Sequence, residues 1–79
     1  GQATEAELAA TRKRVEANRA VARDAAKGAR EQYAMYSNAE RSYRAQNPSV
    51  GTDGLKRELN SYRQQIETLD DLADSMTVA

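Results

Sequence analysis

Acidic residues near the C-terminus are the first candidates for chemistry. Glu67, Asp71 and Asp74 recur at helical spacing, whereas Asp70 and Asp71 are adjacent and must diverge on a helix. A carboxylate metal site would need more ligands, on a rigid loop or across several helices. The sequence has no His, no Cys, no Gly-rich phosphate loop and no Ser beside a base, which excludes the usual nucleophile and general-base arrangements. We therefore predict no catalytic residue, no metal site, no cofactor and no enzymatic activity.

A basic cluster near the N-terminus is the second candidate. Arg12, Lys13 and Arg14 are consecutive, and Arg19 and Arg23 extend them along one helical face. Such a face could bind an anionic partner, through nucleic acid phosphates or lipid headgroups. The alternative is a solvated helix face balanced by nearby glutamates. Because the pI is about 6.5, below that of a typical nucleic-acid module, we favour the solvated face and expect neither nucleic acid nor a membrane as partner.

The charge is divided unevenly along the chain. Net charge is zero over 79 residues, but residues 1–46 hold nine Lys or Arg against six Asp or Glu, and residues 47–79 hold three against six. Opposite halves attract each other, so the division favours intramolecular pairing. A chain of this length buries little apolar surface, and with no cysteine for disulfides we expect oligomerisation to support it.

A long amphipathic helix must carry the basic cluster. Apolar and small residues recur every seven positions, at Leu8, Val15, Ala22, Ala29, Tyr36 and Tyr43, with intermediate positions at Thr11, Asn18, Ala25, Gln32 and Ala39. This spacing is typical of a coiled-coil seam. Most members are alanines, which gain little by burial unless a bulkier residue covers them. The alanine-rich helix therefore requires a partner.

The ends of this helix are marked by Thr4 and Pro48. Thr4 followed by Glu7 fits a capping box, and Pro48 disfavours helical geometry at the residue before it. We predict a helix over about 4–46 and a turn over 47–52. The alternative is a three-helix bundle with a break at Gly28, since glycine is a poor residue for a helix interior.

A shorter second helix is predicted over about 53–76, with Thr52 or Asp53 as its N-cap. Its apolar residues alternate at spacings of four and three: Leu55, Leu59, Tyr62, Ile66, Leu69, Ala73 and Met76. Folded back antiparallel, this helix brings large residues over small ones. The predicted facing pairs are Tyr62 with Tyr36, Leu69 with Ala29, Met76 with Ala22 and Leu59 with Ala39, and the acidic residues 67–74 come beside Arg23, Lys27 and Arg30.

The two helices differ in length, so roughly the first 18–20 residues, including Leu8 and Val15, have no partner within the chain. An isolated helix of that length is marginal in water. We expect a second copy or another helical protein to cover it, through Leu8, Val15 and the alanine face. Tyr33 lies beside the predicted seam, and we assign it and Met35 as the contact residues for a partner at the loop end.

The residues around the turn carry a resemblance. Asn47, Pro48 and Ser49, followed by Leu55, Glu58 and Tyr62, resemble the helix-turn-helix of type III secretion needle subunits, over some 30 residues. The resemblance implies a subunit that polymerises into a filament. The sequence departs from the family in lacking the paired-proline turn, with Gly51 at that position, and in its longer first helix.

Together these observations predict one all-α domain over 1–79, an antiparallel helical hairpin with coiled-coil-like packing. We expect a non-enzymatic structural or protein-interaction module, either a scaffold, an adaptor or an assembly subunit. Two alternatives are a subunit of a secretion apparatus or virion assembly, and binding of nucleic acid or anionic membrane by the basic face.

Overall fold

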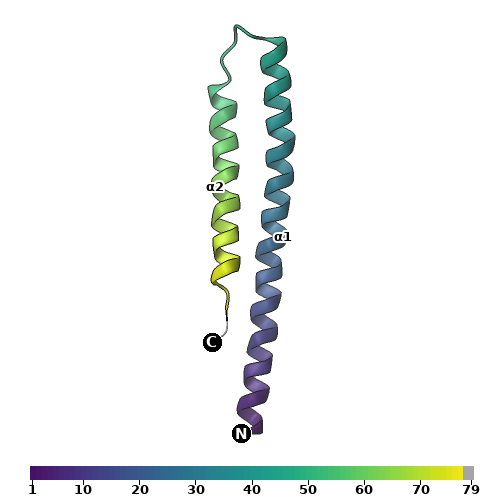
Figure 1. Cartoon of the computed structure of the whole chain (residues 1–79), viewed down its shortest axis with the longest axis vertical. Helices are drawn as coiled ribbons and strands as arrows, with labels where there is room; N and C mark the ends of the chain where they lie inside the picture. The colour runs from purple at the N-terminus through teal and green to yellow at the C-terminus, as the bar shows by residue number, and fades with distance from the viewer. Residues whose placement is uncertain (78–79) are drawn as a thin grey trace.

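The computed structural model describes residues 1–77, and of residues 2 and 3 the backbone only. Two helices make up the fold, α1 over Gln2–Gln46 and α2 over Asp53–Ser75. They run antiparallel side by side, so the chain is an all-α hairpin, as predicted (Figure 1). The alternative break at Gly28 is wrong, because α1 is continuous through that residue.

The start of α1 differs from the prediction. Its N-cap is Gly1, which makes no side-chain cap hydrogen bond, and the amide of Glu5 donates to the Gly1 carbonyl at 3.1 Å. Thr4 and Glu7 therefore lie inside the helix and form no capping box. The local pattern was misleading because alanine and glutamine before Thr4 are also good helix formers, so the helix extends past it.

The turn follows the predicted bounds. Asn47 caps the C-terminal end of α1, and both its backbone and its side-chain amide donate to the Tyr43 carbonyl, at 2.9 and 3.0 Å. Pro48 follows at once, so α1 cannot continue. Of the two predicted N-caps of α2, Thr52 and Asp53, the structure has Thr52. Its hydroxyl makes no capping hydrogen bond.

The interior face of α2 is the one predicted from its apolar spacing. The residues that are buried or half-buried there include six of the predicted seven, Leu59, Tyr62, Ile66, Leu69, Ala73 and Met76. Leu55, in the first turn, remains 43% exposed. Ring stacking of Tyr36 on Tyr62 confirms the predicted register.

The interior face of α1 is rotated relative to the predicted seam. Asn18, Ala25, Gln32 and Ala39 are exposed, so the predicted pairing of Leu59 with Ala39 is wrong. The buried or half-buried positions are instead Thr11, Val15, Arg19, Ala22, Ala26, Ala29, Tyr33, Ser37 and Glu40. Their mean spacing is that of a straight helix, about 3.6 residues per turn, whereas a heptad repeat drifts by about 20° every seven residues on such a helix.

Side-chain volume in the core is small. Among the described residues, the buried apolar side chains are Ala22, Ala26 and Ala73, and no large side chain is fully buried. Such a core excludes little apolar surface from water and stabilises the hairpin weakly.

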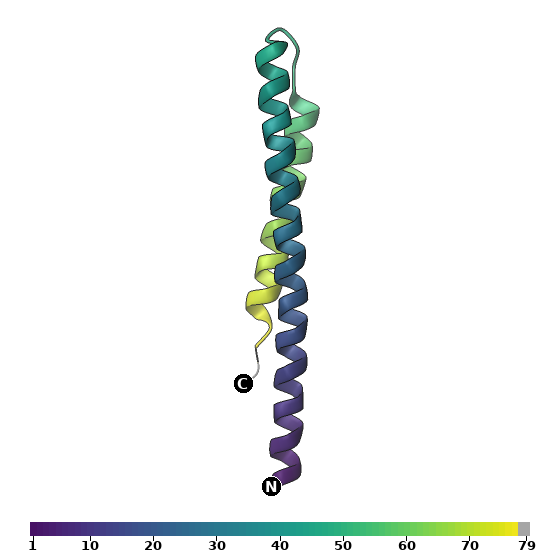
Figure 2. The same ribbon diagram turned by 90° about the vertical axis from the view of Figure 1, so that its right-hand side faces the viewer.

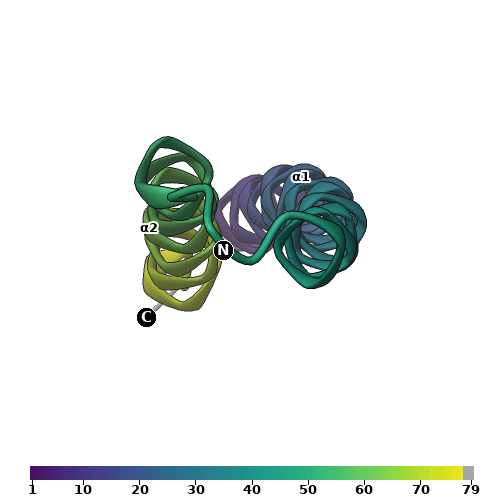
Figure 3. The same cartoon turned by 90° about the horizontal axis from the view of Figure 1, so that it is seen from above.

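The molecule is a rod of 70 × 14 × 11 Å. α2 crosses α1 obliquely, from one side to the other along its length (Figure 2). Seen end on, the two helices form a single layer (Figure 3). The N-terminal part of α1 extends beyond the end of α2 (Figure 1). We call residues 2–18 of α1 the overhang.

Candidate interaction surface

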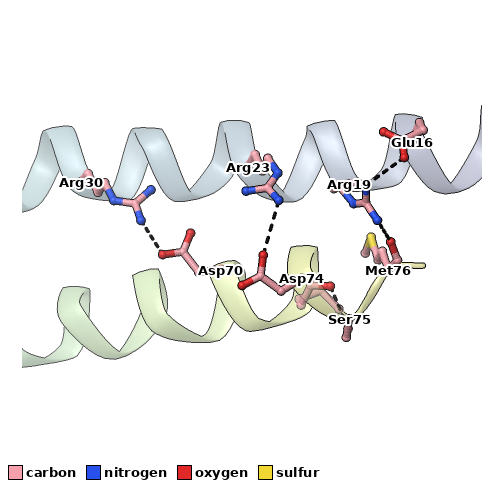
Figure 4. A network of polar contacts seen from close by, with 9 residues as sticks. Glu16, Arg19, Arg23, Arg30, Asp70, Asp74, Ser75 and Met76 are labelled. Carbon is pink, nitrogen blue, oxygen red and sulfur yellow. Dashed lines mark hydrogen bonds and ion pairs between the residues drawn. The ribbon is translucent and has the colours of Figure 1, made fainter.

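One edge of the hairpin is held by arginines of α1 and acceptors of α2. Arg30 pairs with Asp70, and Arg23 pairs with Asp74 at 3.4 Å (Figure 4). Both contacts agree with the predicted alignment of the basic and acidic segments. The side chains are partly exposed, and pairs of this kind contribute at most about 1 kcal/mol each. They favour the antiparallel orientation more than they stabilise the fold.

Arg19, the residue directly after the overhang, contacts the end of α2. Its guanidinium donates to the Met76 carbonyl and pairs with Glu16 at 2.8 Å (Figure 4). Met76 is the C-cap of α2, so the cation lies at the negative end of the helix dipole. The side chain of Arg19 is 24% exposed, and its buried Nε atom has no hydrogen-bond partner among residues 1–77.

The predicted basic face is therefore divided. Arg19 and Arg23 are engaged in the hairpin, whereas Arg12, Lys13 and Arg14 are exposed on the overhang. The Arg14 guanidinium makes a 3.3 Å hydrogen bond to the Thr11 hydroxyl. Among the described residues, these three cations make no ion pair.

Two tyrosines stack across the hairpin near its loop end. The ring centroids of Tyr36 and Tyr62 are 5.5 Å apart, with the planes inclined by 25°. Partial burial, and then the neighbouring Tyr36 hydroxyl, raise the pKa of the Tyr62 phenol above its ordinary value, because both disfavour the phenolate. Tyr36 remains 40% exposed, so this pair is an edge of the interface.

Tyr33 packs within the hairpin. Its hydroxyl accepts a 3.1 Å hydrogen bond from Arg63, and the guanidinium carbon of Arg63 lies 5.9 Å from the ring centroid. The hydrogen bond to Tyr33 raises the pKa of Arg63, which keeps the cation charged. Of the two predicted contact residues, Met35 is the one left largely open, at 54% exposure.

A buried polar contact at the loop was not foreseen from the sequence. Glu40 is 5% exposed and Thr52 is 6% exposed, and the Thr52 hydroxyl donates to Glu40 Oε1 at 2.8 Å. The Arg44 guanidinium lies 3.7 Å from the same oxygen. This contact ties the N-cap of α2 to α1 and turns the Thr52 hydroxyl toward Glu40. The sequence does carry one signal of this contact. Glu40 lies three residues after Ser37 and seven after Tyr33, which places it on the same face of the helix.

The overhang presents an apolar stripe with nothing from the described part of α2 over it. Leu8 is 37% exposed, and Val15 is half-buried on the same face. Thr11 lies between them, and its hydroxyl donates to the Glu7 carbonyl at 2.9 Å. Because that hydroxyl is already satisfied, Thr11 can sit in an apolar contact without an unpaired polar group.

Hollows on the surface of the described chain are open and lie mainly along α2. Two of them have volumes of about 510 and 570 Å³ and are lined mostly by polar side chains, including Arg57, Ser61 and Gln64. Within residues 1–77, no group of three or more acidic side chains is placed to hold a metal ion. In that part of the chain, neither helix combines the length and apolar character needed to cross a membrane.

The fold and its surfaces define a small antiparallel helical hairpin whose long helix outreaches the short one. No protein-family model, curated protein or solved structure matches the chain. The likeness of its turn to type III needle subunits therefore rests on the quoted residues alone.

Proposed function

We propose that this chain is a non-enzymatic protein-interaction module that associates through coiled-coil-like packing of the overhang. The class includes scaffolds, adaptors and assembly subunits. The observation that supports it most is the overhang itself, an amphipathic stretch of α1 that carries Leu8 and Val15 beyond the reach of the described part of α2.

The energetics of the helix support the same proposal. A helical stretch of about 17 residues is marginal in water unless its apolar face is covered. The hairpin beside it has only alanines in its fully buried apolar core. Covering Leu8 and Val15 would add apolar burial where the molecule has least. Association therefore stabilises both the overhang and the fold.

Sedimentation equilibrium over a wide concentration range tests the proposal. We expect a mass above that of the 8.7 kDa monomer, rising with concentration. Leu8→Asp should shift the equilibrium toward monomer, whereas Val21→Asp is a matched control, because Val21 is 69% exposed on another face. A monomer at all concentrations, with Leu8→Asp indistinguishable from wild type in mass and helicity, would refute self-association.

Binding of an anionic partner by Arg12, Lys13 and Arg14 is the less favoured function, because ion pairs within the hairpin already engage the other two cations of the face. It predicts affinity for nucleic acid or anionic vesicles that falls steeply with salt. Unchanged affinity after Arg12→Glu and Arg14→Glu together would exclude it.

A further inference from the structure

The overhang has a self-complementary arrangement of charge. An acidic residue, Glu7, directly precedes Leu8. Seven residues later a basic residue, Arg14, directly precedes Val15. Residues seven apart lie on nearly the same side of a helix. One flank of the apolar stripe therefore carries Glu7 at one end and Arg14 at the other.

Orientation decides how two such stripes can pair. In a parallel pair, the two-fold axis runs along the helices and places the two copies of this flank on opposite sides of the interface, so Glu7 and the partner's Arg14 cannot meet. In an antiparallel pair centred near Thr11, the Leu8 side chain meets the partner's Val15, and Glu7 meets the partner's Arg14. The two-fold axis repeats each contact, so two apolar contacts and two ion pairs form together.

The length of the overhang fits the same register. In the alignment set by the Tyr36–Tyr62 stack, the last residue of α2, Ser75, lies opposite Arg23. When Leu8 faces the partner's Val15, the partner's α1 begins at the level of Val21. The partner helix thus starts beside Met76, the C-cap of α2 that contacts Arg19, and runs in the same direction as α2. Each α1 is then covered along its length, first by its own α2 and then by the other copy.

From these observations we infer that the occupant of the overhang is a second copy of this chain, bound antiparallel with Leu8 against Val15 and Glu7 against Arg14. The inference rests on the proposed function and specifies its partner and geometry. Thr11 lies at the two-fold axis, where its satisfied hydroxyl leaves the methyl group for packing. The overlap is about 20 residues, or about 30 Å, so two rods of 70 Å make a dimer about 110 Å long.

Cross-linking tests the register directly, because the chain has no cysteine of its own. Leu8→Cys and Val15→Cys chains are mixed at a concentration where wild type sediments as a dimer, and are treated with a short bis-maleimide. We expect the mixed Leu8–Val15 product to dominate over either homodimer. Homodimer products of each variant alone would show a parallel pair and overturn the inference, while the proposed self-association would stand.

Charge exchange provides the second arm. Glu7→Arg alone, and Arg14→Glu alone, each place like charges together twice in the dimer, and we expect the dissociation constant to rise about tenfold. The double variant restores both pairs with reversed sign and should return to within about threefold of wild type. Equal dissociation constants for all four chains would overturn the geometry, and a wild type that never dimerises would overturn both the geometry and self-association.

Discussion

Gly28 gives the sharpest test of α1 as one continuous helix. It lies in the helix interior, is exposed, and a Cβ atom built there meets nothing within 4 Å. Replacing glycine with alanine at such a position removes unfolded-state freedom and improves helix propensity, by about 0.5–1 kcal/mol. For a domain of this size, we expect Gly28→Ala to raise the melting temperature by roughly 2–8 °C.

The assay is thermal and urea unfolding followed by helical circular dichroism, at several protein concentrations so that association is separated from folding. Ala25→Gly is the matched control, since Ala25 is exposed on the same helix and should lose about what Gly28→Ala gains. The double variant should unfold like wild type. If Gly28→Ala were neutral or destabilising, α1 would not be an open, continuous helix at this position.

Three further predictions concern the hairpin. Ala26→Leu should destabilise it by about 1–3 kcal/mol, because Ala26 is 0% exposed, whereas Ala25→Leu should change stability by less than about 0.5 kcal/mol; urea unfolding measures both. Thr52→Val removes the hydroxyl that donates to buried Glu40 and should cost about 1–3 kcal/mol in the same assay, with an unchanged midpoint refuting the role of this contact. Tyr62 should titrate above the ordinary phenol pKa of 10.0. Since its raised pKa favours the neutral form in the folded state, the contribution of Tyr62 to stability is constant below pH 10.0 and falls above it; phenolate absorbance of Tyr62 at the ordinary pKa would contradict this.

The second helix could be predicted from the sequence because its apolar residues are large and unambiguous. Leu59, Ile66 and Leu69 fit only one face, and that face packs on α1. Pro48 ended the first helix for a reason that holds in any context, its missing amide and fixed φ. The register then followed from equal rise along both helices, and the stack of Tyr36 on Tyr62 confirms it.

The phase of α1 could not be predicted in the same way. Ala25 and Ala26 are adjacent and equally small, so either one could face α2 at the same cost in transfer free energy. The heptad spacing selected Ala25, but the structure buries Ala26. Because the interior face is rotated in this way, Tyr33 lies inside the hairpin, where its hydroxyl accepts a hydrogen bond from Arg63. The contact between Glu40 and Thr52 depends on how the loop closes, which no local pattern specifies.

The sequence nevertheless keeps its seven-residue repeat along the whole of α1, so the repeat becomes exposed toward the loop end. On a straight helix the repeat drifts by about 60° over three heptads, so it leaves the interior between Ala22 at 4% exposure and Tyr43 at 44%. In the register of the Tyr36–Tyr62 stack, Tyr43 faces Leu55, which is 43% exposed. An apolar edge is therefore open near the loop, far from the overhang.

An antiparallel contact between overhangs closes at two copies, because each copy uses the same surface. Growth into a larger assembly, which the likeness to needle subunits implies, would need another surface, and the edge around Tyr43 and Leu55 is the apolar candidate. Tyr43→Ser should therefore leave the dimer formed through Leu8 unchanged and reduce only species larger than a dimer, as measured by sedimentation velocity at high concentration. Loss of the dimer itself in Tyr43→Ser would refute the separation of the two surfaces.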